Sequence, residues 1–430
     1  MAAKAGTFTL IPGNLTPPTG GSGFLVSGLG FRPSLVVAMS CSLSAENVWD
    51  VTPGMDGCMA MLSDNTVASG TNRTGLTESW NTSVKPHSFW SNSGVMWFRE
   101  TGGAAIYLSA IHDDGFYVGY ASGFEGGYGK ICYYLAMGVE DAQVAQAFGY
   151  EGAAMPVTVG FEPAIYMTLG SGGLGGGAGD IAFADFDVPS WGFGGFDNQV
   201  DSLVQTEWMA NGLSHSETVE QTRWFLDGDG DQWVMDGFTA AQTLGNTAYY
   251  YGRTASTFSI GESDGFPGGI NTRVSAHFMS NALFSGSSVT PPSVGTPLDI
   301  DVGFEPECVI FLGPQTNHGN FFGIPWGGRC FGFLTKDFQC CIAFGAYQRA
   351  NDGDPPGYVA SFCSSDVGWI SNFTDTGLDD PTNPNYGTAE LLPSGFRLNS
   401  LALPKYNQYL RWVAYGFEEE APGFFRVVHR

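Results

Sequence analysis

One phrase occurs three times along this chain and most constrains how the chain can fold. It reads "GFRPSLVVAM" from Gly30, "GFEPAIYMTL" from Gly160 and "GFEPECVIFLG" from Gly303. In each copy glycine permits a positive φ, phenylalanine is an apolar anchor, and proline fixes φ where no ladder donor is needed. The apolar run that follows is continuous rather than alternating, which predicts a strand covered on both faces. The sequence therefore predicts three copies of one β unit.

Two further signals follow each phrase in the same order. A Gly-Phe pair occurs in "DDGFYVGY", "MDGFTA" and "PSGFRLNS", at Gly115, Gly237 and Gly395. Closing strands then read "YYLAMG", "TFSIG" and "RWVAYG", ending at Gly138, Gly261 and Gly416. Asp-Gly ahead of a strand favours a hairpin turn, because both residues tolerate positive φ. Each unit is thus expected to end in a hairpin whose last strand returns to the core.

The expected fold is all-β: three tandem antiparallel β-sandwich units of jelly-roll or lectin-like type. Charged residues make up only 14% of the chain while Gly numbers 62, a composition that favours turns and strands over helices. The predicted boundaries are 1–148, 149–290 and 291–430, with 285–297 as a linker. The junction 138–156 reads as a helix or an edge strand. Segments such as 63–83 and 347–366, rich in Gly, Ser, Asn and Asp, are expected to be surface loops.

Charge and hydropathy exclude two classes of partner. The formal net charge is −25, and Lys and Arg form no cluster longer than a pair, so a phosphate backbone would be repelled and nucleic acid is not expected as a partner. No apolar run approaches the 18 residues of a membrane helix, and the start "MAAKAG" has no apolar signal core. We therefore expect no membrane partner and no secretion signal.

The cysteines favour buried free thiols over a disulfide framework, because they are sparse in a long chain, lack a Cys-x-x-Cys pair and fall mostly in apolar runs. They are Cys41, Cys58, Cys132, Cys308, Cys330, Cys340, Cys341 and Cys363. This usage is typical of a reducing place of synthesis.

Two stretches match catalytic or cofactor-binding motifs, but neither is followed by the helix that its motif requires. Gly170-x-Gly172-x-x-Gly175 resembles a dinucleotide loop, but more glycine follows instead of the helix that would hold a pyrophosphate. "GESDG" at 261–265 fits a nucleophile elbow at Ser263, yet "FPGGI" cannot form the helix that the elbow requires. The six histidines show no ligand or triad spacing. The sequence therefore favours a protein that is not an enzyme and has no cofactor, and a hydrolase is the disfavoured alternative.

One acidic stretch is a weak candidate for calcium. In "DGDGDQW", Asp227, Asp229 and Asp231 take alternate positions, as do the first ligands of a calcium loop. Gln232 and Phe238 stand where an EF-hand needs glycine and glutamate, so an EF-hand is excluded. A looser calcium site remains open beside a solvated acidic turn.

Aromatic residues mixed with Gly, Asn and Ser mark two further stretches, 79–98 and 183–199. Their tryptophans are Trp80, Trp90, Trp97 and Trp191. Such mixtures suit subunit interfaces, where aromatic residues anchor and small polar residues adapt, or stacking on sugars. We expect interface contacts first and glycan contacts as the alternative.

The order of motifs resembles an uncharacterised β-domain repeated in structural proteins of tailed bacteriophages and prophages, with the pattern GFxPxxVIF, FGF, DGFT and YLALGG. The match is best in 30–37 with 114–138, in 160–166 with 236–239, and in 303–312 with 330–334. The middle copy departs from it by closing with "TFSIG", and its tail, 262–288, is expected to reach a neighbouring subunit. The closing strand is also similar to the last strand of H-type lectin-like sandwiches.

The resemblance implies a virion structural protein, a decoration, cement or tail-associated component made in the host cytoplasm. Its partners would be capsid or tail proteins. A tail-fibre or spike adhesin that binds host glycans is the alternative. A homo-oligomer, most plausibly a trimer, is also expected, since so many aromatic residues would otherwise leave exposed apolar patches.

Overall fold

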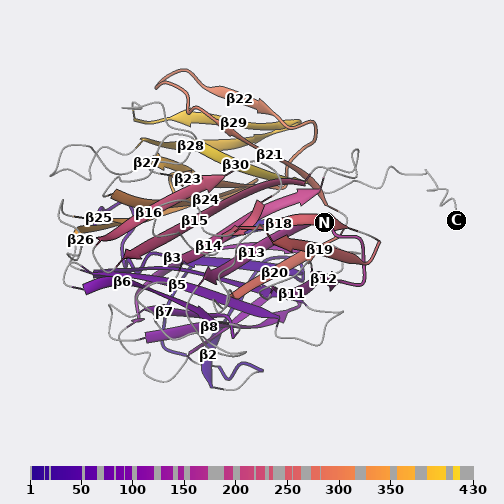
Figure 1. Cartoon of the computed structure of the whole chain (residues 1–430), viewed down its shortest axis with the longest axis horizontal. Helices are drawn as coiled ribbons and strands as arrows, with labels where there is room; N and C mark the ends of the chain where they lie inside the picture. The colour runs from indigo at the N-terminus through magenta and orange to yellow at the C-terminus, as the bar shows by residue number, and fades with distance from the viewer. Residues whose placement is uncertain are drawn as a thin grey trace, which may run out of the picture.

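The chain is all-β, with strands arranged in several antiparallel sheets (Figure 1). The computed structural model describes residues 2–13, 15–18, 21–50, 54–64, 72–81, 84–91, 93–98, 104–120, 127–138, 144–149, 155–172, 188–196, 204–216, 219–227, 232–235, 247–253, 255–262, 273–280, 282–314, 326–348, 356–372, 385–402 and 410–416. In this part of the chain no helix is long and apolar enough to cross a membrane.

The described strands fall into three consecutive sets along the chain. The first is β1 (Ala2–Thr9), β2 (Ser22–Ser27), β3 (Leu35–Ser40), β4 (Gly54–Ser63), β5 (Arg73–Asn81), β6 (Val84–Ser91), β7 (Val95–Phe98), β8 (Ala104–His112), β9 (Gly115–Tyr120) and β10 (Ile131–Gly138). The second is β11 (Val144–Gly149), β12 (Met155–Thr158), β13 (Ile165–Gly172), β14 (Val188–Phe196), β15 (Val204–Ser216), β16 (Val219–Asp227), β17 (Gln232–Met235), β18 (Thr247–Arg253), β19 (Thr257–Glu262) and β20 (Arg273–Met279). The third is β21 (Leu283–Val289), β22 (Leu298–Asp301), β23 (Cys308–Pro314), β24 (Trp326–Thr335), β25 (Gln339–Gln348), β26 (Pro356–Ser364), β27 (Trp369–Asn372), β28 (Asn385–Leu392), β29 (Gly395–Ser400) and β30 (Leu410–Gly416).

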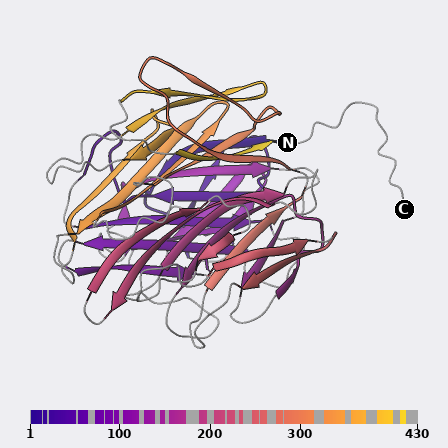
Figure 2. The same cartoon turned by 45° about the horizontal axis from the view of Figure 1, so that its top comes forward.

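Each set contributes one six-stranded and one four-stranded sheet, in the same strand order. The six-stranded sheets run β1-β10-β3-β4-β5-β6, β11-β20-β13-β14-β15-β16 and β21-β30-β23-β24-β25-β26. The four-stranded sheets run β2-β9-β8-β7, β12-β19-β18-β17 and β22-β29-β28-β27, and they lie toward the outside of the molecule (Figure 2).

The strand behind each recurring phrase is central in its sheet, as its continuous apolar sequence predicts. β3 lies between β10 and β4, and all six of its residues are buried. Its side chains alternate between two cores: Leu35, Val37 and Met39 pack in one, Val36 and Ala38 in the other. β23 divides its residues between two cores in the same way. Double-sided burial therefore explains why these strands do not alternate with polar residues.

Two of the sheet pairs form sandwiches with their own cores. In the first, Phe8, Val36 and Tyr134 of the six-stranded sheet pack with Phe24 and Phe116 of the four-stranded sheet. In the second, Phe311 and Trp412 pack with Phe396 and Leu398 across the sheets that contain β23 and β29. Ring pairs such as Phe396 and Trp412, with centroids 5.1 Å apart, fill these layers edge to face.

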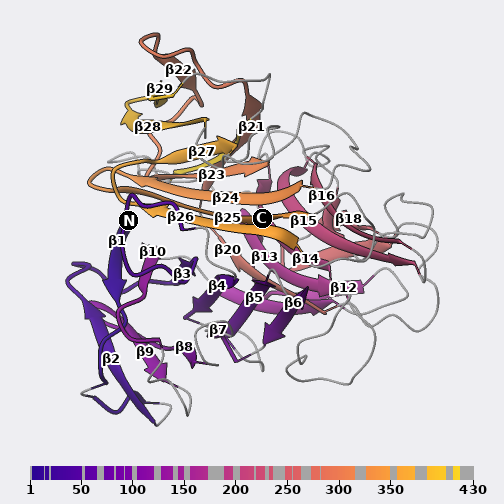
Figure 3. The same cartoon turned by 90° about the vertical axis from the view of Figure 1, so that its left-hand side faces the viewer.

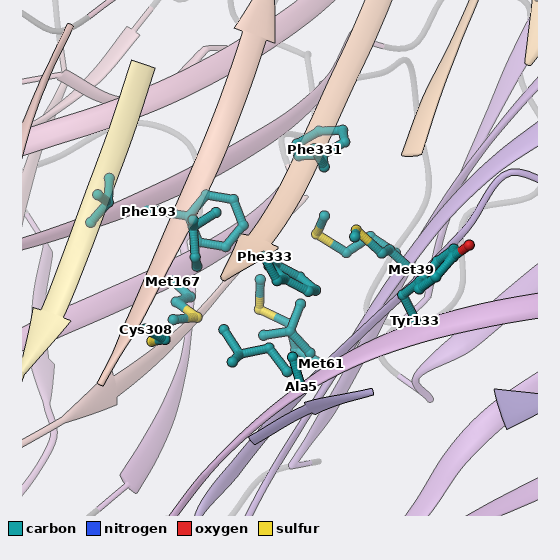
Figure 4. Packing of buried hydrophobic residues seen from close by; sticks show 14 of the residues in the cluster. Ala5, Met39, Met61, Tyr133, Met167, Phe193, Cys308, Phe331 and Phe333 are labelled. Carbon is teal, nitrogen blue, oxygen red and sulfur yellow. The ribbon is translucent and has the colours of Figure 1, made fainter. Parts of the chain in front are cut away.

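The other faces of the three six-stranded sheets meet in one shared core. Met39 and Tyr133 come from the first sheet, Met167 from the second and Phe333 from the third, and their side chains point toward one another (Figure 4). The contacts run round in a cycle. β5 and β6 touch β13, β15 and β16 touch the sheet of β21 and β23, and β25 and β26 touch the first sheet at β1 and β4. Figure 3 shows the three strand sets grouped around this centre.

The middle set corrects the expected position of its hairpin. Thr158 of β12 pairs with Thr257 of β19, as Ser27 pairs with Gly115 and Asp301 with Gly395. The hairpin equivalent to those at Gly115 and Gly395 therefore precedes Thr257, whereas Gly237 lies outside the described residues, between the paired strands β17 and β18. "TFSIG" is β19 rather than the closing strand, which is β20. The expected intersubunit tail, 262–288, contains β20 and most of β21, both paired within sheets.

Several segments expected to be loops are strands of the six-stranded sheets. Residues 63–83 contain β5, and residues 347–366 contain β26. The expected linker 285–297 begins inside β21, which pairs with β30. The junction around 144–149 is an edge strand, β11, rather than a helix. Gly, Ser and Asn misled the prediction because the neighbouring strands, two for β5 and one for the edge strands β21 and β26, supply the hydrogen bonds and packing that low β propensity does not.

The Gly-Phe pair has a different role from the one expected. The first hairpin turns through Asp113 and Asp114, and neither Asp114 nor Gly115 has a positive φ. A Cβ on Gly115 would instead lie 1.9 Å from the carbonyl oxygen of Val26, and one on Gly395 the same distance from that of Ile300. Glycine is needed there because the neighbouring strand approaches closely.

Gly30 offers a test of the recurring phrase, because Gly30, Gly160 and Gly303 all have φ of 81°. No heavy atom would lie within 4 Å of a Cβ at Gly30, so the cost of Gly30→Ala comes from backbone conformation alone. We expect this variant to lose about 1 kcal/mol of unfolding free energy. Gly30→Asn should lose less, since asparagine tolerates the left-handed region. Denaturant unfolding measures both, and equal losses would contradict the explanation.

Candidate functional site

The calcium candidate is only partly described. Asp227 is the last residue of β16, where it pairs with Trp208 of β15, while Asp229 and Asp231 lie outside the described residues. Among the described residues no group of three or more His, Cys, Asp or Glu side chains could hold a metal ion. The calcium site remains a prediction.

The four tryptophans lie in strands rather than in surface loops. Trp80 belongs to β5, Trp90 to β6, Trp97 to β7 and Trp191 to β14. The ring of Trp97 is half-buried against Phe89, with centroids 5.6 Å apart, and its backbone N–H donates to Thr77 Oγ1 at 2.8 Å. The structure thus gives Trp97 a packing role.

The disfavoured catalytic motifs gain no support from the described chain. Gly170 and Gly172 are paired residues of β13, and Gly175 lies outside the described residues. Ser263 also lies outside them.

The densest polar arrangement in the described chain joins the first and third strand sets. The segment 41–50, which follows β3, lies along the end of β26 (Pro356–Ser364). Asp50 and Ser361 exchange two backbone hydrogen bonds of 3.0 and 2.9 Å, and the Asn47 N–H donates to the Cys363 carbonyl at 2.8 Å. The Trp49 ring stacks on Phe362 with centroids 4.7 Å apart. We call this contact the 41–50 junction.

Unusual backbone conformation coincides with this junction. Ser42 and Asn47 both have φ of 61°, and among the described residues they are the non-glycine positions with positive φ. Asn47 is held there by its side chain, which accepts from Ser364 Oγ at 2.6 Å and donates to Asp366 at 2.7 Å. Strained backbone of this kind persists only where surrounding contacts fix it, and it concentrates at functional sites.

A carboxylate links both sides of the junction. Glu46 accepts from the Tyr133 hydroxyl at 2.6 Å through one oxygen and from Ser365 Oγ at 2.8 Å through the other. Tyr133 is fully buried on β10, and burial raises its pKa well above the usual value, with Cys363 and Glu46 as further causes. The tyrosine therefore stays protonated and acts as a donor to Glu46.

Two thiols complete the junction. Cys41 Sγ donates to the carbonyl oxygen of Phe362 at 3.3 Å, and Cys363 Sγ donates to that of Ala45 at 3.5 Å. The neighbouring Cys41 side chain lowers the pKa of Cys363, while burial raises the pKa of Cys41. The prediction of buried free thiols is confirmed, since all eight cysteines are free and buried.

The junction thus combines a carboxylate, a tyrosine and a thiol pair, yet both thiols are about 1% exposed. The hydrogen bonds of its carboxylate and backbone groups fasten two parts of the chain together. The junction was not predicted from the sequence, because its two sides lie more than 300 positions apart in the chain and share no local pattern. The nearest sequence signal was the apolar setting of Cys41 and Cys363.

A second buried titratable group lies where the second strand set meets the first. His277 of β20 is fully buried, and its Nε2 lies 3.1 Å from Thr74 Oγ1 of β5. Its Nδ1 has no hydrogen-bond partner, and burial lowers its pKa to about 3. In the sheet register His277 pairs with Met167. The equivalent pairs of the first and third sets are Leu135 with Val37 and Val413 with Ile310. His277 thus takes a position that is apolar in the other two sets.

Comparison with known proteins identifies no family. No protein-family model matches the sequence, and no curated protein matches it. Among solved structures, a structure of PNGF-II in space group C2 is similar over 91% of this chain and 99% of that chain, with 9% sequence identity and a TM-score of 0.24. A likeness this weak carries no argument about fold or function.

The placement of His277 predicts a pH dependence of stability. Above pH 6.5 the imidazole is neutral in both folded and unfolded chains. As the pH falls from 6.5 toward 3, the unfolded chain binds a proton at this histidine and the folded chain does not. The free energy of unfolding therefore falls by roughly 1.4 kcal/mol per pH unit. His277→Leu, which copies Leu135, should remove this loss. Denaturant unfolding of both proteins between pH 6.5 and 4 measures it, and parallel pH curves would contradict the prediction.

Proposed function

We propose that the chain consists of three tandem β-sandwich units, each with one six-stranded and one four-stranded sheet. The repeated strand order and the two described sandwich cores support this count. The expected boundaries, 1–148, 149–290 and 291–430, need adjustment, because β11 pairs with β20 and β21 pairs with β30. We place the first boundary between Gly138 and Val144 and the second between Met279 and Leu283.

These units serve, in our proposal, as a structural protein of a tailed-bacteriophage particle: a decoration, cement or tail-associated component. It would be made in the host cytoplasm and act in the virion through contacts with capsid or tail proteins. The motif resemblance supplies the family expectation, and the positive φ shared by the three phrase glycines is consistent with it. The acidic surface, with a net charge of −25, disfavours nucleic acid as the contact.

The shared core is the observation that carries the proposal. Three six-stranded sheets use one face each to bind one another, so the middle of the molecule is filled with apolar side chains. Active sites and small-ligand sites are usually concave, with a few convergent polar groups. The polar groups that converge at the 41–50 junction fasten strand sets together. This organisation suits a rigid spacer that acts by contact rather than by chemistry.

The location of the protein tests the proposal. Mass spectrometry of particles purified on a density gradient should find the chain in stoichiometric amounts, and immunogold labelling should place it on the head or the tail. Absence from intact particles would contradict a virion role. Glycan-array binding at millimolar calcium that is lost in both Trp90→Ala and Trp191→Ala would favour the adhesin instead. Ester or glycan hydrolysis that Ser263→Ala abolishes would favour an enzyme.

The expected homotrimer also needs reconsidering. Among the residues whose side-chain exposure the structure describes, the exposed large hydrophobic ones are Ile11, Leu15, Val48, Tyr128, Val294 and Leu401. The cyclic packing of three sheets already places within one chain the contacts that a trimer would make between protomers. We therefore propose that the protein is a monomer whose three strand sets make the contacts that three protomers would make in a trimer.

Light scattering on the isolated protein at micromolar concentration should give a mass near 45.8 kDa. A mass three times larger would restore the homotrimer and contradict this proposal. Measuring at low and high salt separates the two causes of a monomer, since repulsion between acidic chains weakens with salt whereas a completed internal ring does not change.

A further inference from the structure

Cys41 and Cys363 face each other across the 41–50 junction, 322 positions apart in the sequence. Cys41 Sγ lies 3.3 Å from the carbonyl oxygen of Phe362, the residue before Cys363. Cys363 Sγ lies 3.5 Å from the carbonyl oxygen of Ala45. Each sulfur atom therefore contacts a backbone carbonyl oxygen of the opposite strand set. Both side chains also belong to the shared core.

The surrounding contacts hold this pair in place. The Asn47 N–H donates to the carbonyl of Cys363 itself, and the Asp50–Ser361 backbone pair lies just beyond it. On the other side, Ser42 donates through Oγ to the backbone and side chain of Asp56. Fixed backbones on both sides keep the sulfur atoms together, which favours a bond between these two thiols over other pairings.

The pair has the chemical features that oxidation needs. The neighbouring Cys41 side chain lowers the pKa of Cys363, which favours the thiolate, the reactive form. By contrast, burial raises the pKa of Cys132, Cys308 and Cys340. Ser44, Ala45 and Val48 of the same segment are exposed, and the Ala45 carbonyl contacts Cys363 Sγ. We expect a small oxidant to reach the pair from this side.

We propose that Cys41 and Cys363 form a reversible disulfide when the protein meets hydrogen peroxide. The Cys363 thiolate attacks one peroxide oxygen, the O–O bond breaks, and the released hydroxide takes up a proton to become water. The resulting Cys363 sulfenic acid is then attacked by the Cys41 sulfur, the S–O bond breaks, and the second hydroxide leaves as water with the Cys41 proton. The two sulfur atoms together supply the two electrons that reduce peroxide to two waters.

The bond would close the cycle of strand sets covalently. The first set is joined to the second, and the second to the third, by the chain itself, whereas the third meets the first only through noncovalent contacts such as the 41–50 junction. The disulfide therefore lies at the contact that no peptide link secures. It would strengthen the protein once it leaves a reducing compartment, and it does not depend on the proposed virion role.

The test is oxidation of the folded protein with hydrogen peroxide, followed by thiol titration in guanidinium and peptide mapping without reductant. The free thiols should fall from eight to six. A single cross-linked peptide pair should contain Cys41 and Cys363, the unfolding temperature should rise, and dithiothreitol should reverse both changes. A titre that stays at eight, a bridge between other cysteines, or sulfinic acid at Cys363 without a bridge would overturn the proposal.

Single serine variants provide the controls. Cys41→Ser and Cys363→Ser should each block the bridge and the peroxide-dependent rise in unfolding temperature. Cys132→Ser, which changes a buried thiol in the core of the first sandwich, should still form the bridge. If a variant at the junction fails to fold, the peptide map of the wild-type protein still decides the outcome, because it needs no substitution.

Discussion

The structure depends on apolar burial on both faces of the central strands. β3 (Leu35–Ser40) sends Val37 into the shared core and Val36 into the core of its own sandwich, and β23 (Cys308–Pro314) divides Ile310 and Val309 in the same way. A fully buried side chain of this size contributes about 1.5–3 kcal/mol. Because each strand belongs to two cores, neither a sandwich nor the shared centre can loosen without exposing the other face of the same strands.

A ring of three sheets must also close. Two junctions in the cycle are between sets that follow one another along the chain, while the third brings together sets separated by the whole middle set. The 41–50 junction lies at this third contact, and it holds the buried Tyr133, the left-handed Asn47 and the Cys41–Cys363 pair. Polar contacts with strict geometry suit this place, because apolar packing alone would not fix how the first and last sets align.

The sequence predicted features whose cause is local. The phrase from Gly30 encodes a positive φ and a doubly buried strand within ten residues, and both were correctly expected. The middle hairpin was misplaced because Thr257 stands where the other sets have Gly115 and Gly395, so the local signal is missing there. The 41–50 junction was not foreseen, since Glu46 and Ser365 become partners only through the closure of three sheets.

Joining three units in one chain lets equivalent positions differ. The strand register shows that Leu135, His277 and Val413 take corresponding positions in the three sets. A second corresponding trio is Tyr133, Ser275 and Arg411. Their partners on the neighbouring strands are Met39, Leu169 and Leu312, in that order. Three identical protomers would carry the same residue at each such position, so their three interfaces would be identical. Here Tyr133 meets Glu46 only at the junction of the first and third sets, and His277 meets Thr74 only where the second meets the first. Buried polar groups therefore make the junctions of the ring different from one another.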